Sequence, residues 1–209
     1  MKTCVIFCAA EFDKPVQPVG EADFVVAADG GLKHTQALGI EPDVILGDFD
    51  SLGYIPDKAV VFPVEKDDTD SMLAAKLGLE RGCRRFVIYG GMDGQRLDHT
   101  VANFQMLQYL AERGAGAYLV GRQYLATVLR NGSAVFDAGA EGILSVFCMG
   151  PDASGVDLEG LKYNLTNGTL SSGYPLGVSN HFVGQSARIA VKDGSLLLLW
   201  DRKNGFPER

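Results

Sequence analysis

Apolar runs alternate with helix-like segments from the N-terminus to about Gly121, and this alternation constrains the fold more than any other feature. The runs are continuous and rich in Val and Ile, as expected of parallel strands that are covered on both faces. Strand–helix alternation predicts an α/β domain with a mostly parallel sheet. The expected strands are "CVIFCAA", "DFVVAAD", "DVILGDFD", "AVVFPVE", "RRFVIYGG" and "GAYLVG".

Three segments between these runs have helical patterns, namely 30–39, 69–82 and 97–114. In the second, we expect Thr69 or Asp70 to cap the helix and Gly82 to end it. In the third, apolar residues recur at helical spacing and predict a buried face. That face consists of Leu97, Val101, Phe104 and either Leu107 or Gln108.

The pattern changes after Arg122, where helical periodicity disappears and short strands with turn signals follow. The stretch "ATVLRNGSAVFD" resembles a hairpin with Asn131-Gly132 at its turn. Asn167-Gly168 and Asp193-Gly194 are further turn signals. We therefore expect two domains: a mostly parallel α/β domain over 1–122, and an all-β, sandwich-like domain over 123–209.

Charge and cysteine usage narrow the class of protein. A net charge of −7 makes nucleic acid or an anionic membrane an unfavourable partner and suits a cationic or metal-bound ligand. The apolar run "SLLLLW" is too short to cross a bilayer, and the N-terminal stretch fits a first core strand better than a trimmed signal peptide. The four cysteines form no metal-binding motif, so we expect reduced thiols in a cytoplasmic protein.

Acidic residues follow four consecutive predicted strands. One such Asp is usually a turn former, but four loops of this kind at the carboxyl ends of parallel strands indicate a ligand site. Asp48 and Asp50 lie two residues apart, which in an extended chain points both carboxylates to one face, and Mg²⁺ would offset their repulsion. The loops contain Asp29, then Asp48 and Asp50, then Asp67, Asp68 and Asp70, and finally Asp93, Arg96, Asp98 and His99.

The chain has neither a GxxxxGK[ST] loop nor a GxGxxG motif to bind phosphate. The glycine-rich turns Gly30-Gly31 and Gly90-Gly91 could present backbone N–H groups to an anion near a helix start. Arg96 could clamp a phosphate bidentately, or it could form a structural pair with a neighbouring Asp.

Four motifs, "ADGG", "LGDFDS", "KDDTDSMLA" and "GGMDGQRLDHTVANF", occur in an order and spacing that resemble the thiamine pyrophosphokinase family. "EGLKYNLTNGTL" followed by "GVSNHF" resembles the C-terminal domain of that family. The resemblance implies transfer of the terminal diphosphate of ATP to the hydroxyl of thiamine, which gives thiamine diphosphate and AMP. It also implies a homodimer that holds thiamine between the α/β domain of one subunit and the β domain of the other.

The resemblance assigns roles to individual residues. Asp48, Asp50 and Asp70 match acids that ligate Mg²⁺ or position the reacting groups, and Asp29, with Gly30 and Gly31, matches the nucleotide-side loop. Ser179 and Asn180 match a pair that reaches thiamine from the partner subunit. Catalytic roles then fall to Asp70, Arg96 and Asp98, and substrate binding also to Asp68, Gly90 and Gly91.

The chemistry agrees with these residue types. A carboxylate could accept the proton of the attacking alcohol while Mg²⁺ and Arg96 neutralise phosphate charge, and the base could be Asp70 or another acid. Lys66 fits a phosphate contact or a surface lysine, and His99 fits a helix-start contact. Two other classes are compatible with the motifs: a metal-dependent phosphohydrolase, and a non-catalytic thiamine or nucleotide sensor.

Overall fold

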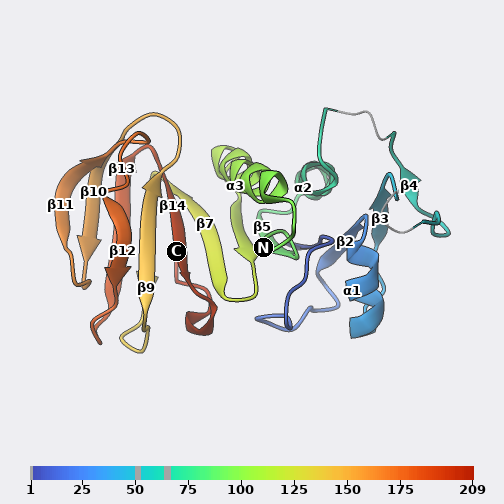
Figure 1. The fold of residues 1–209 in the computed structure, drawn as a ribbon, viewed down its shortest axis with the longest axis horizontal. Helices are drawn as coiled ribbons and strands as arrows, with labels where there is room; N and C mark the ends of the chain where they lie inside the picture. The colour runs from blue at the N-terminus through green and yellow to red at the C-terminus, as the bar shows by residue number, and fades with distance from the viewer. Residues whose placement is uncertain (1, 50–52, 64–66) are drawn as a thin grey trace. The chain divides into compact units, whose positions relative to one another are not determined.

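The computed structural model describes residues 2–49, 53–63 and 67–209, and the chain divides into two units, Met1–Arg122 and Gln123–Arg209 (Figure 1). The first is a parallel sheet with helices and the second consists of antiparallel strands, so the predicted fold class is confirmed. Asp50 and Lys66, both of interest from the sequence, lie outside the described residues.

The sheet of the first unit has the strand order β6-β5-β1-β2-β3-β4, and every pair in it is parallel. The central strands are buried along almost their whole length, which explains their continuous apolar sequences. Each strand lies within one of the six predicted runs, except that β1 begins one residue before its run. The bounds are β1 Thr3–Phe7, β2 Phe24–Ala28, β3 Val44–Gly47, β4 Val60–Val61, β5 Arg85–Tyr89 and β6 Gly116–Val120.

The helices of this unit are α1 Gly31–Leu38, α2 Asp70–Glu80 and α3 Leu97–Glu112. Figure 1 shows α1 on one side of the sheet and α2 and α3 on the other. Thr69 is the N-cap of α2, because its hydroxyl accepts the Met72 N–H at 3.2 Å. Gly82, with φ of 80°, follows the end of the helix as predicted.

The buried face of α3 differs from the predicted one. Leu97 and Val101 are 73% and 51% exposed, so the face predicted to include them is wrong. The prediction is confirmed for Leu107, which is buried together with Asn103, Met106 and Leu110. Asn103 interrupts the apolar pattern on this face, and it can be buried because both ends of its amide are hydrogen-bonded.

The second unit contains two antiparallel groups of strands, in the orders β12-β9-β14-β7 and β11-β10-β13-β8. Phe136 of β8 packs edge-on against Trp200 of β14, with ring centroids 5.4 Å apart, so side chains of the two groups share a core. The bounds are β7 Tyr124–Arg130, β8 Ser133–Phe136, β9 Ile143–Cys148, β10 Ala153–Glu159, β11 Leu165–Leu170, β12 Gly177–His181, β13 Ala187–Asp193 and β14 Ser195–Asp201.

Two of the three predicted turns have a different role. Asn131-Gly132 joins β7 to β8, but these strands belong to different groups, so the predicted hairpin is wrong. The Asn131 side chain instead accepts the Gly194 N–H at 2.9 Å, which ties together two corners where the chain changes sheet. Asn167-Gly168 lies inside β11, where shifts in register mark an irregular pairing with β10.

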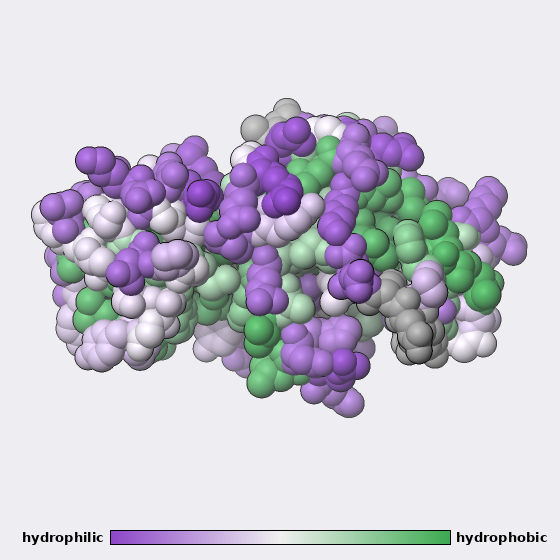
Figure 2. Space-filling view, turned by 90° about the horizontal axis from the view of Figure 1, so that it is seen from above, coloured by the Kyte–Doolittle hydropathy of each residue, from purple (hydrophilic) through white to green (hydrophobic). Residues whose placement is uncertain are grey.

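None of the described helices has the length and apolar character that crossing a membrane requires. Figure 2 shows hydrophilic side chains along one face of the molecule, with smaller hydrophobic areas between them. All four cysteines are free thiols, and three of them are buried.

Candidate functional site

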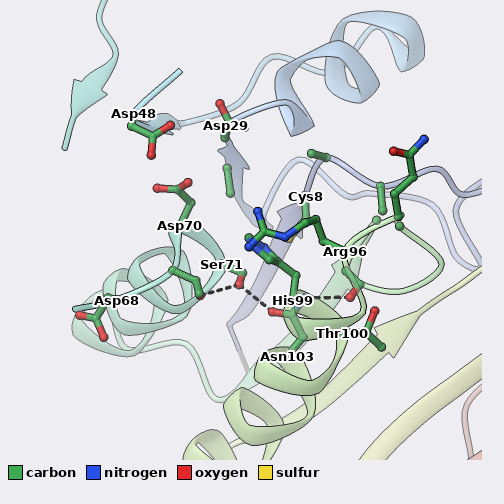
Figure 3. A pocket seen from close by; sticks show the side chains of 18 residues that line it. Cys8, Asp29, Asp48, Asp68, Asp70, Ser71, Arg96, His99, Thr100 and Asn103 are labelled. Atoms are coloured by element: carbon green, nitrogen blue, oxygen red, sulfur yellow. Dashed lines mark hydrogen bonds between the residues drawn. The ribbon is translucent and has the colours of Figure 1, made fainter. Parts of the chain in front are cut away.

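A cavity of about 710 Å³ opens in the first unit, where the carboxyl ends of β1, β2, β3 and β5 meet the start of α2 and α3. Open parallel sheets bind ligands at this edge. The structure brings Asp29, Asp48, Asp68 and Asp70 to this cavity from three different loops, as Figure 3 shows. Further residues of the predicted motifs also line it, among them Gly90, Gly91, Arg96, His99 and Asn103.

The strand ends can approach one another closely because glycine occupies critical positions. A Cβ on Gly31 would lie 1.9 Å from the Phe7 carbonyl oxygen, and one on Gly90 would lie 2.5 Å from the Cys8 and Ala10 carbonyl oxygens. Gly90 also has a φ of 68°, which glycine adopts without strain. Gly30 and Gly31 are buried behind Asp29 and are not among the residues that line the cavity.

The loop after β3 does not continue as an extended chain. The strand ends at Gly47, and Phe49 is buried with a φ of 59°, a left-handed conformation that is unusual for a bulky residue. Asp48 and Asp50 are predicted to share a face only if the chain is extended, and at Phe49 it is not. Because Asp50 lies outside the described residues, the shared metal role of the two acids stays a prediction.

Asp48 and Asp70 point their carboxylates toward the same part of the cavity in Figure 3. Within the described ranges no three histidine, cysteine or acidic side chains are grouped closely enough to hold a metal ion by themselves. Mg²⁺ sites, however, are commonly completed by waters and substrate phosphates around one or two carboxylates. The hard oxygen donors at this cavity therefore fit Mg²⁺ bound together with a phosphorylated ligand.

Asp68 differs from its neighbours because it has a cationic partner. Its Oδ2 lies 2.6 Å from the Nζ of Lys76, and this hydrogen bond raises the pKa of the lysine. Lys76 also lies 6.0 Å from the ring centroid of Tyr109 on α3. The negative charge of Asp68 is thus compensated from within α2, before any ligand binds.

Arg96 is paired with Asp98 through its guanidinium group. Nε donates to both carboxylate oxygens at 3.0 and 3.2 Å, and Nη2 donates to Oδ2 at 2.6 Å. These bonds lower the pKa of Asp98 to about 2. Arg96 lines the cavity while Asp98 does not, so the acid orients the arginine at the entrance of the site.

Cys8 lines the cavity as a neutral thiol. Burial raises its pKa to about 12, and the negative charge of Asp70 is a second, smaller cause. A thiol in this state is a poor nucleophile, so we assign it no covalent chemistry.

The second unit has a smaller cavity of about 150 Å³ beside Tyr163, Leu176 and Val178. Asn180 lines it and is 3% exposed. Its side chain accepts the Tyr163 N–H at 3.0 Å and donates to the Tyr163 carbonyl at 2.7 Å. Ser179 is exposed with a φ of 58°, so the two predicted thiamine contacts differ: one is open to solvent and the other is bonded to the backbone.

Sequence reasoning assigned no role to several polar residues of the larger cavity, among them Ser71 and Asn103. The Ser71 hydroxyl donates to the Asn103 Oδ1 at 2.6 Å, and the Asn103 Nδ2 donates to the Gly91 carbonyl at 2.8 Å (Figure 3). The available signal was the position of Asn103, three residues before Met106 and four before Leu107, on the apolar face of a helix.

Comparisons with known proteins agree with this two-part architecture. The family model "Thiamin pyrophosphokinase, catalytic domain" matches residues 17–119, and "Thiamin pyrophosphokinase, vitamin B1 binding domain" matches residues 136–196. The fold and the two matches define the class of protein: the catalytic-domain match lies over the α/β unit, and the vitamin B1 binding match lies over the β unit. The chain belongs to the thiamin pyrophosphokinase family.

Individual relatives are distant in sequence but close in fold. The thiamine pyrophosphokinase of Bacillus subtilis is 25% identical over 183 residues, which cover 83% of this chain and 85% of that protein. The crystal structure of a Bacillus subtilis thiamine pyrophosphokinase superposes with a TM-score of 0.81 at 23% identity, covering 96% of this chain and 99% of that one. The corresponding structure from Geobacillus thermodenitrificans gives a TM-score of 0.76 at 28% identity, covering 96% and 97%.

Proposed function

We propose that this protein transfers the diphosphate of ATP to the hydroxyl of thiamine, producing thiamine diphosphate and AMP. The observation that carries the proposal is the acidic cavity at the carboxyl ends of β1, β2, β3 and β5, within the region that matches the family's catalytic domain. Four carboxylates and one arginine there suit a cationic acceptor and a metal-bound triphosphate.

In the proposed reaction the hydroxyl oxygen of thiamine forms a bond to the β-phosphorus of ATP. The bond from that phosphorus to the oxygen bridging to the α-phosphate breaks, and AMP leaves with that oxygen. A carboxylate of the cavity, with Asp70 the first candidate, accepts the hydroxyl proton. Arg96 contributes a fork-shaped cation to the phosphates, and Asp98 keeps the guanidinium in place.

The proposed reaction also assigns binding roles. Asp48, Asp50 and Asp70 would hold Mg²⁺, which supplies charge neutralisation on the phosphates. Asp29, held by the buried Gly30-Gly31 turn behind it, together with Asp68, Gly90 and Gly91, would position the nucleotide. The cytoplasmic location expected from the cysteines remains part of the proposal.

The test is incubation with ATP, Mg²⁺ and thiamine, followed by separation of the nucleotides. We expect AMP and thiamine diphosphate in equal amounts, with AMP formation dependent on thiamine. Inorganic phosphate released without thiamine would favour a phosphohydrolase instead. Binding of ligands with AMP at background would favour a sensor.

We also propose a homodimer in which Ser179 and Asn180 of one subunit complete the site formed by the acids of the other. Asp48→Asn would be mixed with the double variant Ser179→Ala/Asn180→Ala under conditions that exchange subunits. A statistical mixture contains about half heterodimers, each with one intact site, so activity at thiamine well below the wild-type KM, where the double variant is weak, should recover toward about a quarter of wild type. No recovery after verified exchange would contradict a shared site.

A further inference from the structure

Asn103 joins two walls of the larger cavity through the two ends of one side chain. Its Nδ2 reaches the carbonyl of Gly91, in the turn after β5, and its Oδ1 reaches the hydroxyl of Ser71, at the start of α2. Asn103 itself lies on α3, the helix that begins beside Arg96. With only 5% of its surface exposed, this amide is held in a single arrangement.

The direction of every hydrogen bond in this group follows from its partners. A carbonyl can only accept, so the Asn103 amide nitrogen must face Gly91 and its oxygen must face Ser71. The Ser71 hydroxyl therefore donates to Asn103. Since that uses its single proton, the 3.0 Å contact between Thr69 and Ser71 requires Thr69 to be the donor. Thr69 in turn accepts the Met72 N–H, which caps α2.

The result is a chain of four hydrogen bonds with one polarity, from the Met72 N–H through Thr69, Ser71 and Asn103 to the Gly91 carbonyl. The bond from Asn103 to Gly91 requires glycine at position 91. A Cβ there would lie 2.5 Å from Leu119 and 3.2 Å from the Asn103 nitrogen. Asp70 lies between Thr69 and Ser71, so the chain fixes the backbone on both sides of this acid.

We propose that Asn103, acting through Ser71, is a positioning residue of the diphosphate-transfer site. It holds the backbone that carries Asp70 at a set distance from the Gly90-Gly91 turn. The proposal rests on the proposed function. It also assigns the Ser71 proton to Asn103, so Ser71 is neither a nucleophile nor a proton donor to substrate.

The test compares Ser71→Ala and Asn103→Ala with a matched control, Gln108→Ala. Gln108 is an amide on the same helix that donates to Glu112 one turn away, outside the cavity. We expect kcat to fall by about tenfold or more in the two test variants while KM for ATP and thiamine changes by less than about threefold, since misplacement impairs the reacting geometry more than binding. The double variant should be no worse than the more impaired single variant, because either substitution breaks the same chain.

Two further variants test the chemistry of the group. Ser71→Thr keeps the hydroxyl and should keep kcat, so a Ser71→Ala enzyme as active as Ser71→Thr would overturn the proposal. Asn103→Asp keeps the shape but faces a carboxylate toward the Gly91 carbonyl, and it should lose at least as much kcat as Asn103→Ala. Wild-type kcat in Ser71→Ala would be decisive even if the Asn103 variants failed to fold.

Amide hydrogen exchange tests the positioning without relying on activity. The Met72 N–H should lose protection in Ser71→Ala relative to Gln108→Ala, because Thr69 loses the acceptor that orients it. Unchanged exchange at Met72 would overturn the positioning role. If the wild-type enzyme makes no AMP, the proposed function fails, but the exchange result still decides whether Asn103 and Ser71 order this segment.

Discussion

The cavities of the two units differ most in charge. The larger one, in the α/β unit, is lined by four aspartates and one arginine, whereas the smaller one, in the β unit, is lined by uncharged residues among those the structure describes. Charged groups converge where phosphates and a metal must be handled, and neutral apolar groups where an organic ring can be covered. The difference suggests that the first unit carries out the chemistry and the second contributes recognition.

Two buried asparagines show the same contrast. Asn103 bonds to groups on two separate segments, so it sets the distance between them. Asn180 bonds to both backbone groups of Tyr163 and also accepts the adjacent His181 N–H, so it fixes the backbone that carries this 58% exposed tyrosine. One buried amide therefore links two walls of the larger cavity, and the other fixes the backbone of a tyrosine beside the smaller one.

The largest effect should follow from removing charge in the first unit. Asp48→Asn and Asp70→Asn should each lower kcat by more than about a hundredfold, because each removes a proposed metal ligand. The melting temperature without Mg²⁺ should stay level or rise, since like-charge repulsion is relieved. Steady-state kinetics and thermal unfolding measure the two quantities.

The matched control for these variants is Asp57→Asn, an exposed carboxylate of the same unit outside the cavity. It should retain wild-type kcat. If Asp48→Asn changed only the KM for thiamine, the contrast between the two cavities would be wrong, because thiamine would then be recognised by the α/β unit.

A smaller loss is expected for Arg96→Lys. A lysine ammonium cannot reproduce the three bonds by which the guanidinium is held to Asp98, nor a bidentate grip on phosphate. We expect kcat/KM for ATP to fall by more than about tenfold, equivalent to about 1.4 kcal/mol of barrier. Unchanged ATP kinetics would show that the Arg96–Asp98 pair is structural only.

The sequence predicted those parts of this molecule that follow from periodicity and strand direction. The six parallel strands and the gathering of Asp29, Asp48, Asp68 and Asp70 could be inferred because carboxyl ends of parallel strands share an edge. Local signals failed where tertiary contacts decided the outcome. Leu97 matched the helical pattern but is exposed.

The contacts that organise the site could not be inferred from spacing. The hydrogen bonds of Asn103 join segments 12 and 32 residues away, and those of Asn180 reach 17 residues back to Tyr163. The left-handed backbone of Phe49 is equally invisible in a sequence, since bulky residues rarely adopt it. Asparagine in a helix or strand indicates only an unfavourable propensity until its partners are known.

The effect of Asn180→Ala should be smaller and of a different kind. Losing both bonds frees the backbone that carries Tyr163 beside the smaller cavity, so KM for thiamine should rise by about fivefold while kcat changes little. Thr169→Ala, an exposed position on β11, is the control and should leave KM unchanged. A fall in kcat alone would place chemistry in the β unit and contradict the contrast between the two cavities.

The smallest effect concerns the pH dependence of Asp98. Arg96 lowers the pKa of this carboxyl to about 2, below the value of about 3.9 for an unperturbed aspartate. A carboxyl with a depressed pKa contributes its ion pair fully above the unperturbed value and loses it as the pH falls through about 2. Asp98 therefore stays ionised from pH 5 to 9, and Asp98→Asn should lower kcat/KM only a few-fold without moving the acidic limb of the pH profile. If the acidic limb of the pH profile shifts in this variant, Asp98 titrates during the reaction. A carboxylate of the α/β unit that does not line the cavity would then carry a proton.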